Sequence, residues 1–126
     1  MNDLNLSQTT STPAILADWD KGIIQMKGDS YPENSFEVFQ PLIEWVETFL
    51  AQTSRPLHLE LELVYLNTSS IRSMMDIFDQ LEAAHKNGGQ VSAHWAYDVN
   101  NERVGSLAEE FREDCSFPFT INSKPR

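Results

Sequence analysis

The stretch of residues 57–65 restricts this chain to a narrow set of folds. It places five large apolar side chains on one face and three polar ones on the other: Leu57, Leu59, Leu61, Leu63 and Tyr65 against His58, Glu60 and Glu62. Strict period-two alternation is typical of a β-strand that covers a hydrophobic core with one face only. We therefore predict a strand here, in a sheet whose opposite face is partly open to water.

An amphipathic helix is predicted directly after this strand. Apolar side chains recur there at intervals of three and four and so fall on one stripe: Ile71, Met74, Met75, Phe78 and Leu81. Asn87-Gly88-Gly89 then supplies a C-terminal stop, since glycine readily ends a helix.

The segment before this strand predicts a hairpin and a helix. Residues 14–18 and 21–27 have strand character with a short turn between them, and residues 28–34 read as a loop. A helix follows from about residue 35 into the low fifties, with these side chains inward: Phe36, Phe39, Ile43, Val46 and Phe49 or Leu50. Because proline lacks a backbone donor, we expect an irregular first turn and a main helix that starts near Pro41.

In the rest of the chain, predicted strands and helices continue to alternate. Residues 91–97 predict a strand, residues 100–113 a helix, and residues 117–121 a short last strand. The order ββαβαβαβ predicts a single α/β domain over residues 13–126, with a mixed five-stranded sheet and helices mainly on one face. Residues 1–12 are polar and are expected to form a flexible N-terminal arm.

Composition narrows the possible partners. The 126 residues carry nine Lys and Arg against nineteen Asp and Glu, a formal charge of -10, which repels nucleic-acid phosphates and anionic lipid headgroups. The N-terminus lacks the pattern of a signal peptide, and no apolar run approaches the ~20 residues of a membrane span. We expect a cytoplasmic protein with no nucleic-acid binding and no membrane insertion.

Catalytic and cofactor signals are weak. The three histidines fall in different elements without metal-ligand spacing, and no glycine-rich loop opens a helix, so neither a metal nor a cofactor is predicted. One enzymatic alternative stays open, in which His58, Glu60 and Glu62 act on the open sheet face. Solvated side chains explain that face more simply.

The strand-to-helix junction carries three adjacent hydroxyls, at Thr68, Ser69 and Ser70. Helix capping is the commonest role of such residues. However, the first helical turn contains no acid before Asp76, so its partial positive charge is not neutralised, and Arg72 lies in the same turn. A phosphate would be favourable at this place, where it would create a charged, bulky surface.

Motifs along the chain resemble those of the SiaC-type regulatory phosphoproteins. They comprise Tyr31-Pro32-Glu33-Asn34, Pro41-Leu42 with Trp45, Tyr65-Leu66-Asn67-Thr68-Ser69-Ser70, Leu81-Glu82, Trp95-Ala96-Tyr97-Asp98 and Phe117-Pro118-Phe119. The resemblance covers nearly the whole chain after residue 13. The junction motif is its most specific part.

The resemblance implies a STAS-like fold and a phosphorylation switch. It implies that a SiaB-type kinase phosphorylates Thr68 and that a SiaA-type phosphatase of the PP2C class removes the phosphate. It further implies that the unphosphorylated form, without enzymatic activity of its own, binds and activates a SiaD-type diguanylate cyclase, raising cyclic di-GMP and promoting aggregation and biofilm.

Within this resemblance, Thr68 is the expected phosphate acceptor and Ser69 the second choice. Asn67, Ser69, Ser70 and Arg72 are the candidate surroundings of the phosphate and of a partner, with Ser70 as the helix cap. An anti-sigma-factor antagonist that works by the same partner switching is an alternative function.

Overall fold

A computed structural model describes residues 3–125 of the chain, and these residues form six strands and three helices. In chain order the elements are β1 (Leu4–Leu6), β2 (Ala14–Asp18), β3 (Ile23–Ser30), α1 (Ser35–Gln52), β4 (Leu57–Leu66), α2 (Thr68–Lys86), β5 (Val91–Asp98), α3 (Glu102–Glu113) and β6 (Phe119–Lys124).

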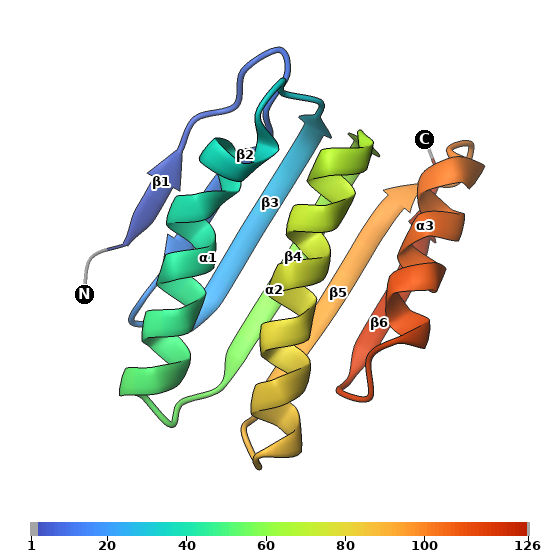
Figure 1. Cartoon of the computed structure of the whole chain (residues 1–126). Helices are drawn as coiled ribbons and strands as arrows, with labels where there is room; N and C mark the ends of the chain where they lie inside the picture. The colour runs from blue at the N-terminus through green and yellow to red at the C-terminus, as the bar shows by residue number, and fades with distance from the viewer. Residues whose placement is uncertain (1–2, 126) are drawn as a thin grey trace.

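All strands belong to one mixed sheet, whose spatial order β1-β2-β3-β4-β5-β6 is the order of the chain. β1, β2 and β3 pair antiparallel, whereas β3 through β6 pair parallel, each joined to the next by one helix. The three helices cover the same face of the sheet (Figure 1). The predicted α/β class, the mixed sheet and the one-sided helices are confirmed.

The sheet has six strands rather than the predicted five. The extra strand, β1, pairs with β2 and lies inside the segment that the sequence predicts as an arm. Leu4 and Leu6 pack against the core, which anchors this short strand. Three residues are too few for a period-two pattern to stand out, so the sequence pattern does not predict β1. Residues 1 and 2 of the predicted arm lie outside the described residues.

β3 runs further than the sequence predicts, to Ser30, so the loop before α1 is shorter. The pairing of β3 with β4 shifts register between Gly28 and Asp29. Gly28 has a φ of 116°, which residues with a Cβ rarely adopt, and so the strand continues through the irregularity.

α1 begins at Ser35 as a regular helix, and the prediction that the main helix starts near Pro41 is wrong. The Asn34 side chain caps the helix by accepting from the Glu37 N–H at 3.3 Å. Pro41 lies inside the helix on its exposed side, where water can reach the carbonyl that lost its donor. Phe36, predicted inward, is 64% exposed because the core side of α1 is taken by Ser35, Phe39 and Leu42.

α2 is rotated relative to the predicted stripe. Met75 is 46% exposed, while Ser70, Ser73 and Ile77 are buried beside Met74, Phe78 and Leu81. The sequence pattern does not separate the two neighbouring methionines, because both lie near the edge of the apolar stripe. The predicted stop is confirmed, with Asn87 as the C-cap residue.

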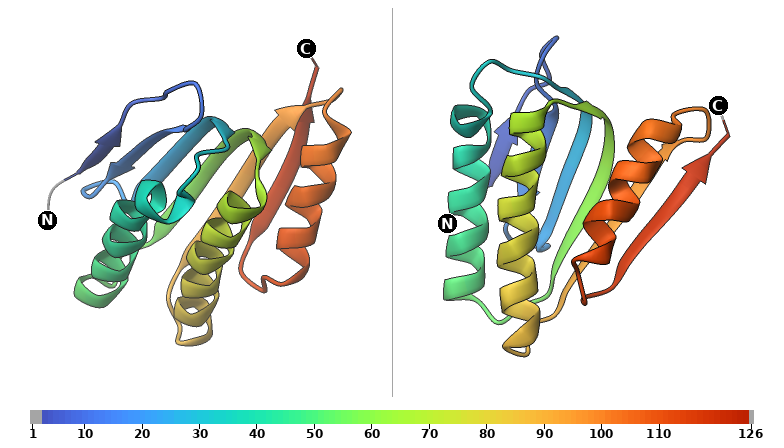
Figure 2. Two further views of the ribbon diagram at one scale, coloured as in Figure 1. Left: turned by 45° about the horizontal axis from the view of Figure 1, so that its top comes forward. Right: turned by 45° about the vertical axis from the view of Figure 1, so that its right-hand side comes forward.

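α3 and β6 each start two residues later than predicted. The Asn101 side chain caps α3 by accepting from the Val104 N–H at 3.2 Å. Pro118 directly precedes β6, so its missing N–H costs the sheet no ladder bond. The α1 and α2 ribbons lie side by side, whereas the α3 ribbon lies over the last strands and meets α2 through side chains such as Phe111, which contacts Phe78 (Figure 2).

Candidate functional site

The strand-to-helix junction is organised by Asn67 rather than by a hydroxyl. The Asn67 side-chain oxygen accepts from the Ser70 N–H at 2.9 Å, which makes Asn67 the N-cap of α2. The predicted capping role of Ser70 is therefore wrong. An asparagine just before three hydroxyl residues was the available signal, since asparagine is at least as good an N-cap as serine.

Asn67 also fastens the junction to the segment before α1. Its backbone N–H donates to the Ser30 carbonyl at 2.9 Å, and its side-chain amide donates to the Pro32 carbonyl at 3.1 Å. The amide thus uses both its oxygen and its nitrogen, which fixes the start of α2 against the end of β3.

Behind Asn67 lies a cluster of serine hydroxyls. Ser30, Ser35 and Ser70 are fully buried or nearly so. The Ser70 Oγ atom lies 2.7 Å from Ser30 Oγ and 3.0 Å from Ser35 Oγ. Ser35 Oγ in turn lies 2.7 Å from Ser69 Oγ. The Ser69 hydroxyl donates to the Asn67 side-chain oxygen at 3.2 Å. The sequence does not point to Ser30 and Ser35, because both lie more than 30 residues before the junction.

Thr68 differs from these neighbours. Its side chain is exposed and, within residues 3–125, makes no hydrogen bond. Thr68 opens α2, whose first turn holds no acidic residue, and so the partial positive charge of the helix N-terminus is available to an anion. Arg72, one turn further, is also exposed and has no ion pair among the described residues. The structure thus brings a free hydroxyl and a free guanidinium to one stripe.

The elements that meet at this junction also expose apolar side chains. Tyr31 and Tyr65 form an edge-to-face pair with ring centroids 6.2 Å apart, and Phe36 and Met75 project to solvent from α1 and α2. A groove of about 470 Å³ lies beside α2, with Leu66 and Ile71 along one side and α3 residues along the other. Clustered exposed apolar groups are typical of a protein-binding surface.

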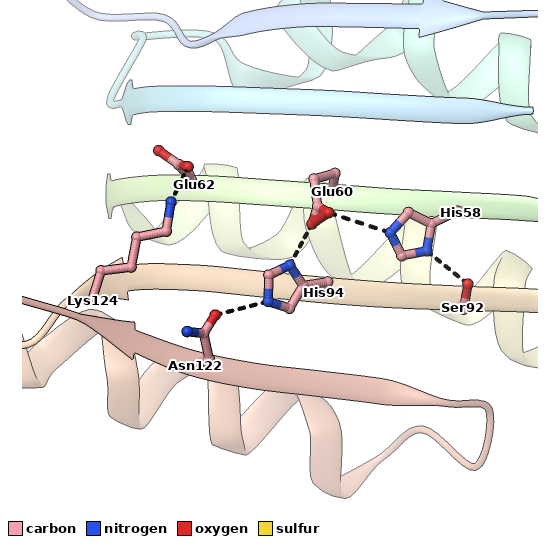
Figure 3. Close-up of polar contacts among 7 residues, drawn as sticks. All are labelled: His58, Glu60, Glu62, Ser92, His94, Asn122 and Lys124. Carbon is pink, nitrogen blue, oxygen red and sulfur yellow. Dashed lines mark hydrogen bonds and ion pairs between the residues drawn. The ribbon is translucent and has the colours of Figure 1, made fainter. Parts of the chain in front are cut away.

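The open face of the sheet carries a ladder of polar side chains (Figure 3). Glu60 on β4 lies between two histidines, 3.5 Å from His58 Nε2 and hydrogen-bonded to His94 Nδ1. The second ring nitrogen of each histidine meets another strand, at the Ser92 hydroxyl on β5 and the Asn122 side-chain oxygen on β6. A further ion pair joins Lys124 to Glu62 at 2.6 Å.

The ionisation of this ladder differs from that of an acid–base catalyst. The hydrogen bond to Glu60 raises the pKa of His94 above its ordinary value, with Asn122 adding to the effect. The hydrogen bond from Lys124 lowers the pKa of Glu62, so this carboxylate holds its charge rather than storing a proton. A carboxyl group that acts as a general acid needs a raised pKa, so the lowered pKa of Glu62 does not support that role for it.

We predict that the His94–Glu60 contact stabilises the protein more at low pH. A group whose pKa is higher in the folded state contributes fully below its unfolded value of about 6.5, and the contribution is lost as pH rises through the raised folded value. Urea unfolding of the wild type and H94Q between pH 5.5 and 9 should show a stability difference that shrinks as pH rises. His58, Glu62 and Lys124 face the same ladder and remain unchanged in both proteins. A difference that is constant with pH would contradict the prediction.

Among residues 3–125, no helix is long and apolar enough to cross a membrane, and no group of three or more His, Cys, Asp or Glu side chains is placed to hold a metal ion.

A comparison with protein families identifies the chain. The model of the SiaC family regulatory phosphoprotein matches residues 6–124. The chain belongs to the SiaC family. The family predicted from the sequence motifs is thereby confirmed.

Relatives of this SiaC family member include proteins of Pseudomonas aeruginosa. An uncharacterised protein of strain UCBPP-PA14 is 62% identical over 123 residues, which cover 98% of each chain. The crystal structure of apo-SiaC from P. aeruginosa is 61% identical, with a TM-score of 0.94 over 97% of this chain and 99% of that one. A crystal structure of the diguanylate cyclase SiaD in complex with its activator SiaC gives the same identity and TM-score, over 97% of this chain and 100% of that one.

Proposed function

We propose that this protein is a phosphorylation-controlled activator of a diguanylate cyclase. In its unphosphorylated form it binds and activates a SiaD-type cyclase in the cytoplasm, which raises cyclic di-GMP and promotes aggregation and biofilm. A SiaB-type kinase phosphorylates Thr68, and a SiaA-type phosphatase of the PP2C class restores the free hydroxyl. The protein itself performs no catalysis.

The observation that carries this proposal is the free Thr68 hydroxyl among exposed apolar groups. Thr68, Arg72 and Met75 are spaced by four and three residues, so they share one outward stripe of α2. A phosphate on Thr68 would bring about -1.5 to -2 charges to the N-terminal end of that stripe. This chain resembles a SiaC whose structure is solved in complex with SiaD, and this favours a cyclase as its partner over an anti-sigma factor.

Arg72 is expected to make different contacts in the unmodified and the phosphorylated protein. In the unmodified protein its guanidinium is free to contact a partner, while a phosphate on Thr68 would attract it one turn back along α2. Phosphorylation would thus place the phosphate dianion on the docking surface and pair it with the Arg72 guanidinium, which would otherwise be free to contact the partner. We therefore expect phosphorylation to weaken docking without refolding the domain.

The proposal is tested by phosphorylation followed by co-purification. We expect a SiaB-type kinase with ATP to place phosphate on Thr68, and the phosphorylated protein to lose the tagged cyclase that the untreated protein retains. Treatment with the phosphatase should restore retention. T120A, which removes an exposed hydroxyl on β6 away from the groove beside α2, serves as the matched control and should behave as wild type. Equal cyclase retention before and after complete phosphorylation would overturn the proposal.

A further inference from the structure

We propose that Ser35 decides which of two adjacent hydroxyls accepts the phosphate, by holding the Ser69 hydroxyl in a buried chain and leaving Thr68 free. This inference rests on the phosphorylation proposed above and concerns the regulation of the same site. Ser35 belongs to the first turn of α1, so the selection is made by a residue distant in sequence from both candidate acceptors.

The hydroxyl chain ends at the Asn67 side-chain oxygen, which lies 3.2 Å from the Ser69 oxygen and 3.5 Å from the Ser35 oxygen. Ser69 and Ser35 also lie 2.7 Å from each other, so when one of them donates to Asn67 the other can donate to it. In both arrangements Ser35 can accept from Ser70 at 3.0 Å, and Ser70 can accept from Ser30 at 2.7 Å. The chain runs from the end of β3 to the cap of α2, and consecutive bonds polarise one another.

Phosphoryl transfer requires an acceptor hydroxyl that is free to approach ATP, and the hydroxyl chain restrains that of Ser69. The acceptor oxygen attacks the γ-phosphorus of ATP, an O–P bond forms as the bond to the leaving ADP breaks, and the hydroxyl proton passes to a base of the kinase. The Ser69 proton is directed toward Asn67 or Ser35, and Ser69 is hydrogen-bonded to Ser35 in both arrangements, so these contacts must break first. Thr68 has neither bond to break.

Burial keeps the chain in place. Ser30, Ser35 and Ser70 have almost no exposed surface, so water does not substitute for a lost partner at their hydroxyls. Ser69 is exposed at the outer end of the chain, which makes it the one member that a kinase would otherwise reach. The hydroxyl chain thus protects the accessible hydroxyl that directly adjoins Thr68.

The experiment measures phosphate on Ser69 by phosphopeptide mass spectrometry in a T68V background. Valine matches threonine in shape and lacks the hydroxyl. We expect T68V to accept little phosphate and S35A/T68V to phosphorylate Ser69 about fivefold faster, the change that corresponds to one hydrogen bond of about 1 kcal/mol. S35C/T68V should move in the same direction, because a thiol of similar size is a weak hydrogen-bonding group and preserves the packing.

S73A/T68V is the matched control, since Ser73 is buried on the same helix and takes no part in the chain. It should leave the Ser69 rate unchanged, and thermal unfolding should confirm that each variant is folded. Equal Ser69 rates in T68V, S35A/T68V and S35C/T68V would overturn the role of Ser35. Absence of phosphate from Thr68 in the wild type would instead overturn the proposed switch, so the two failures are distinguishable.

Discussion

T68E is expected to reduce activation of a SiaD-type cyclase by about tenfold or more, a loss of at least about 1.4 kcal/mol in docking free energy. The glutamate places a negative charge on the surface proposed for docking, which also exposes Met75 of the same stripe, and a partner would have to desolvate it. Cyclic di-GMP formation by the cyclase at a fixed concentration of each variant measures the effect.

T68A is the control for this prediction and should activate within about twofold of the wild type, because it keeps the surface neutral. Unfolding of the domain would not explain a loss in T68E. An acid in the first turn of α2 interacts favourably with the helix N-terminus, by roughly 0.3–1 kcal/mol, so T68E should be at least as stable as T68A. Full activation by T68E, or loss of activation in both variants, would contradict the switch at Thr68.

The largest effect on stability is expected at Phe78, whose replacement by alanine should lower the free energy of unfolding by about 3–5 kcal/mol. Phe78 is 3% exposed and joins α2 to two other elements, with ring centroids 4.9 Å from Phe111 on α3 and 5.3 Å from Phe119 on β6. Alanine would leave a cavity where these elements meet, and the aromatic contacts would be lost as well. Urea unfolding monitored by circular dichroism measures the change.

M75A provides the matched control on the same helix. Met75 is exposed, so its truncation should change the free energy of unfolding by no more than about 0.5 kcal/mol. If Met75 contacts the partner as proposed, M75A should weaken cyclase retention while leaving stability intact. Equal destabilisation by M75A and F78A would show that the observed rotation of α2 is incorrect.

Much of the fold is predictable from local patterns. The alternation in residues 57–65 marks β4 and its solvent-facing glutamates, and the spacing of apolar residues identifies α2. Prediction from local patterns fails where a residue type is compatible with two positions in a helix. Pro41 is compatible with a helix start or with an exposed interior position, and only the packing of α1 against the sheet selects the second. Phe36 is exposed for the same reason, since the regular helix from Ser35 turns it away from the core.

At the candidate site, the sequence by itself determined the place and the residue types. It placed three adjacent hydroxyls at the start of a helix whose first turn has no acid, and its motifs identified the family that the comparison confirms. That Thr68 is the acceptor stays a prediction. The sequence could not distinguish the hydroxyls, because three adjacent residues of similar chemistry carry the same local signal.

Only the tertiary structure separated them. A helix turns about 100° per residue, so Thr68, Ser69 and Ser70 face solvent, α1 and the core in turn. Ser30 and Ser35 come from distant parts of the chain to bind the inner two hydroxyls, and Asn67 takes the capping role. What a hydroxyl at this junction can do depends on long-range hydrogen bonds, and these form only when β3, α1 and α2 pack together.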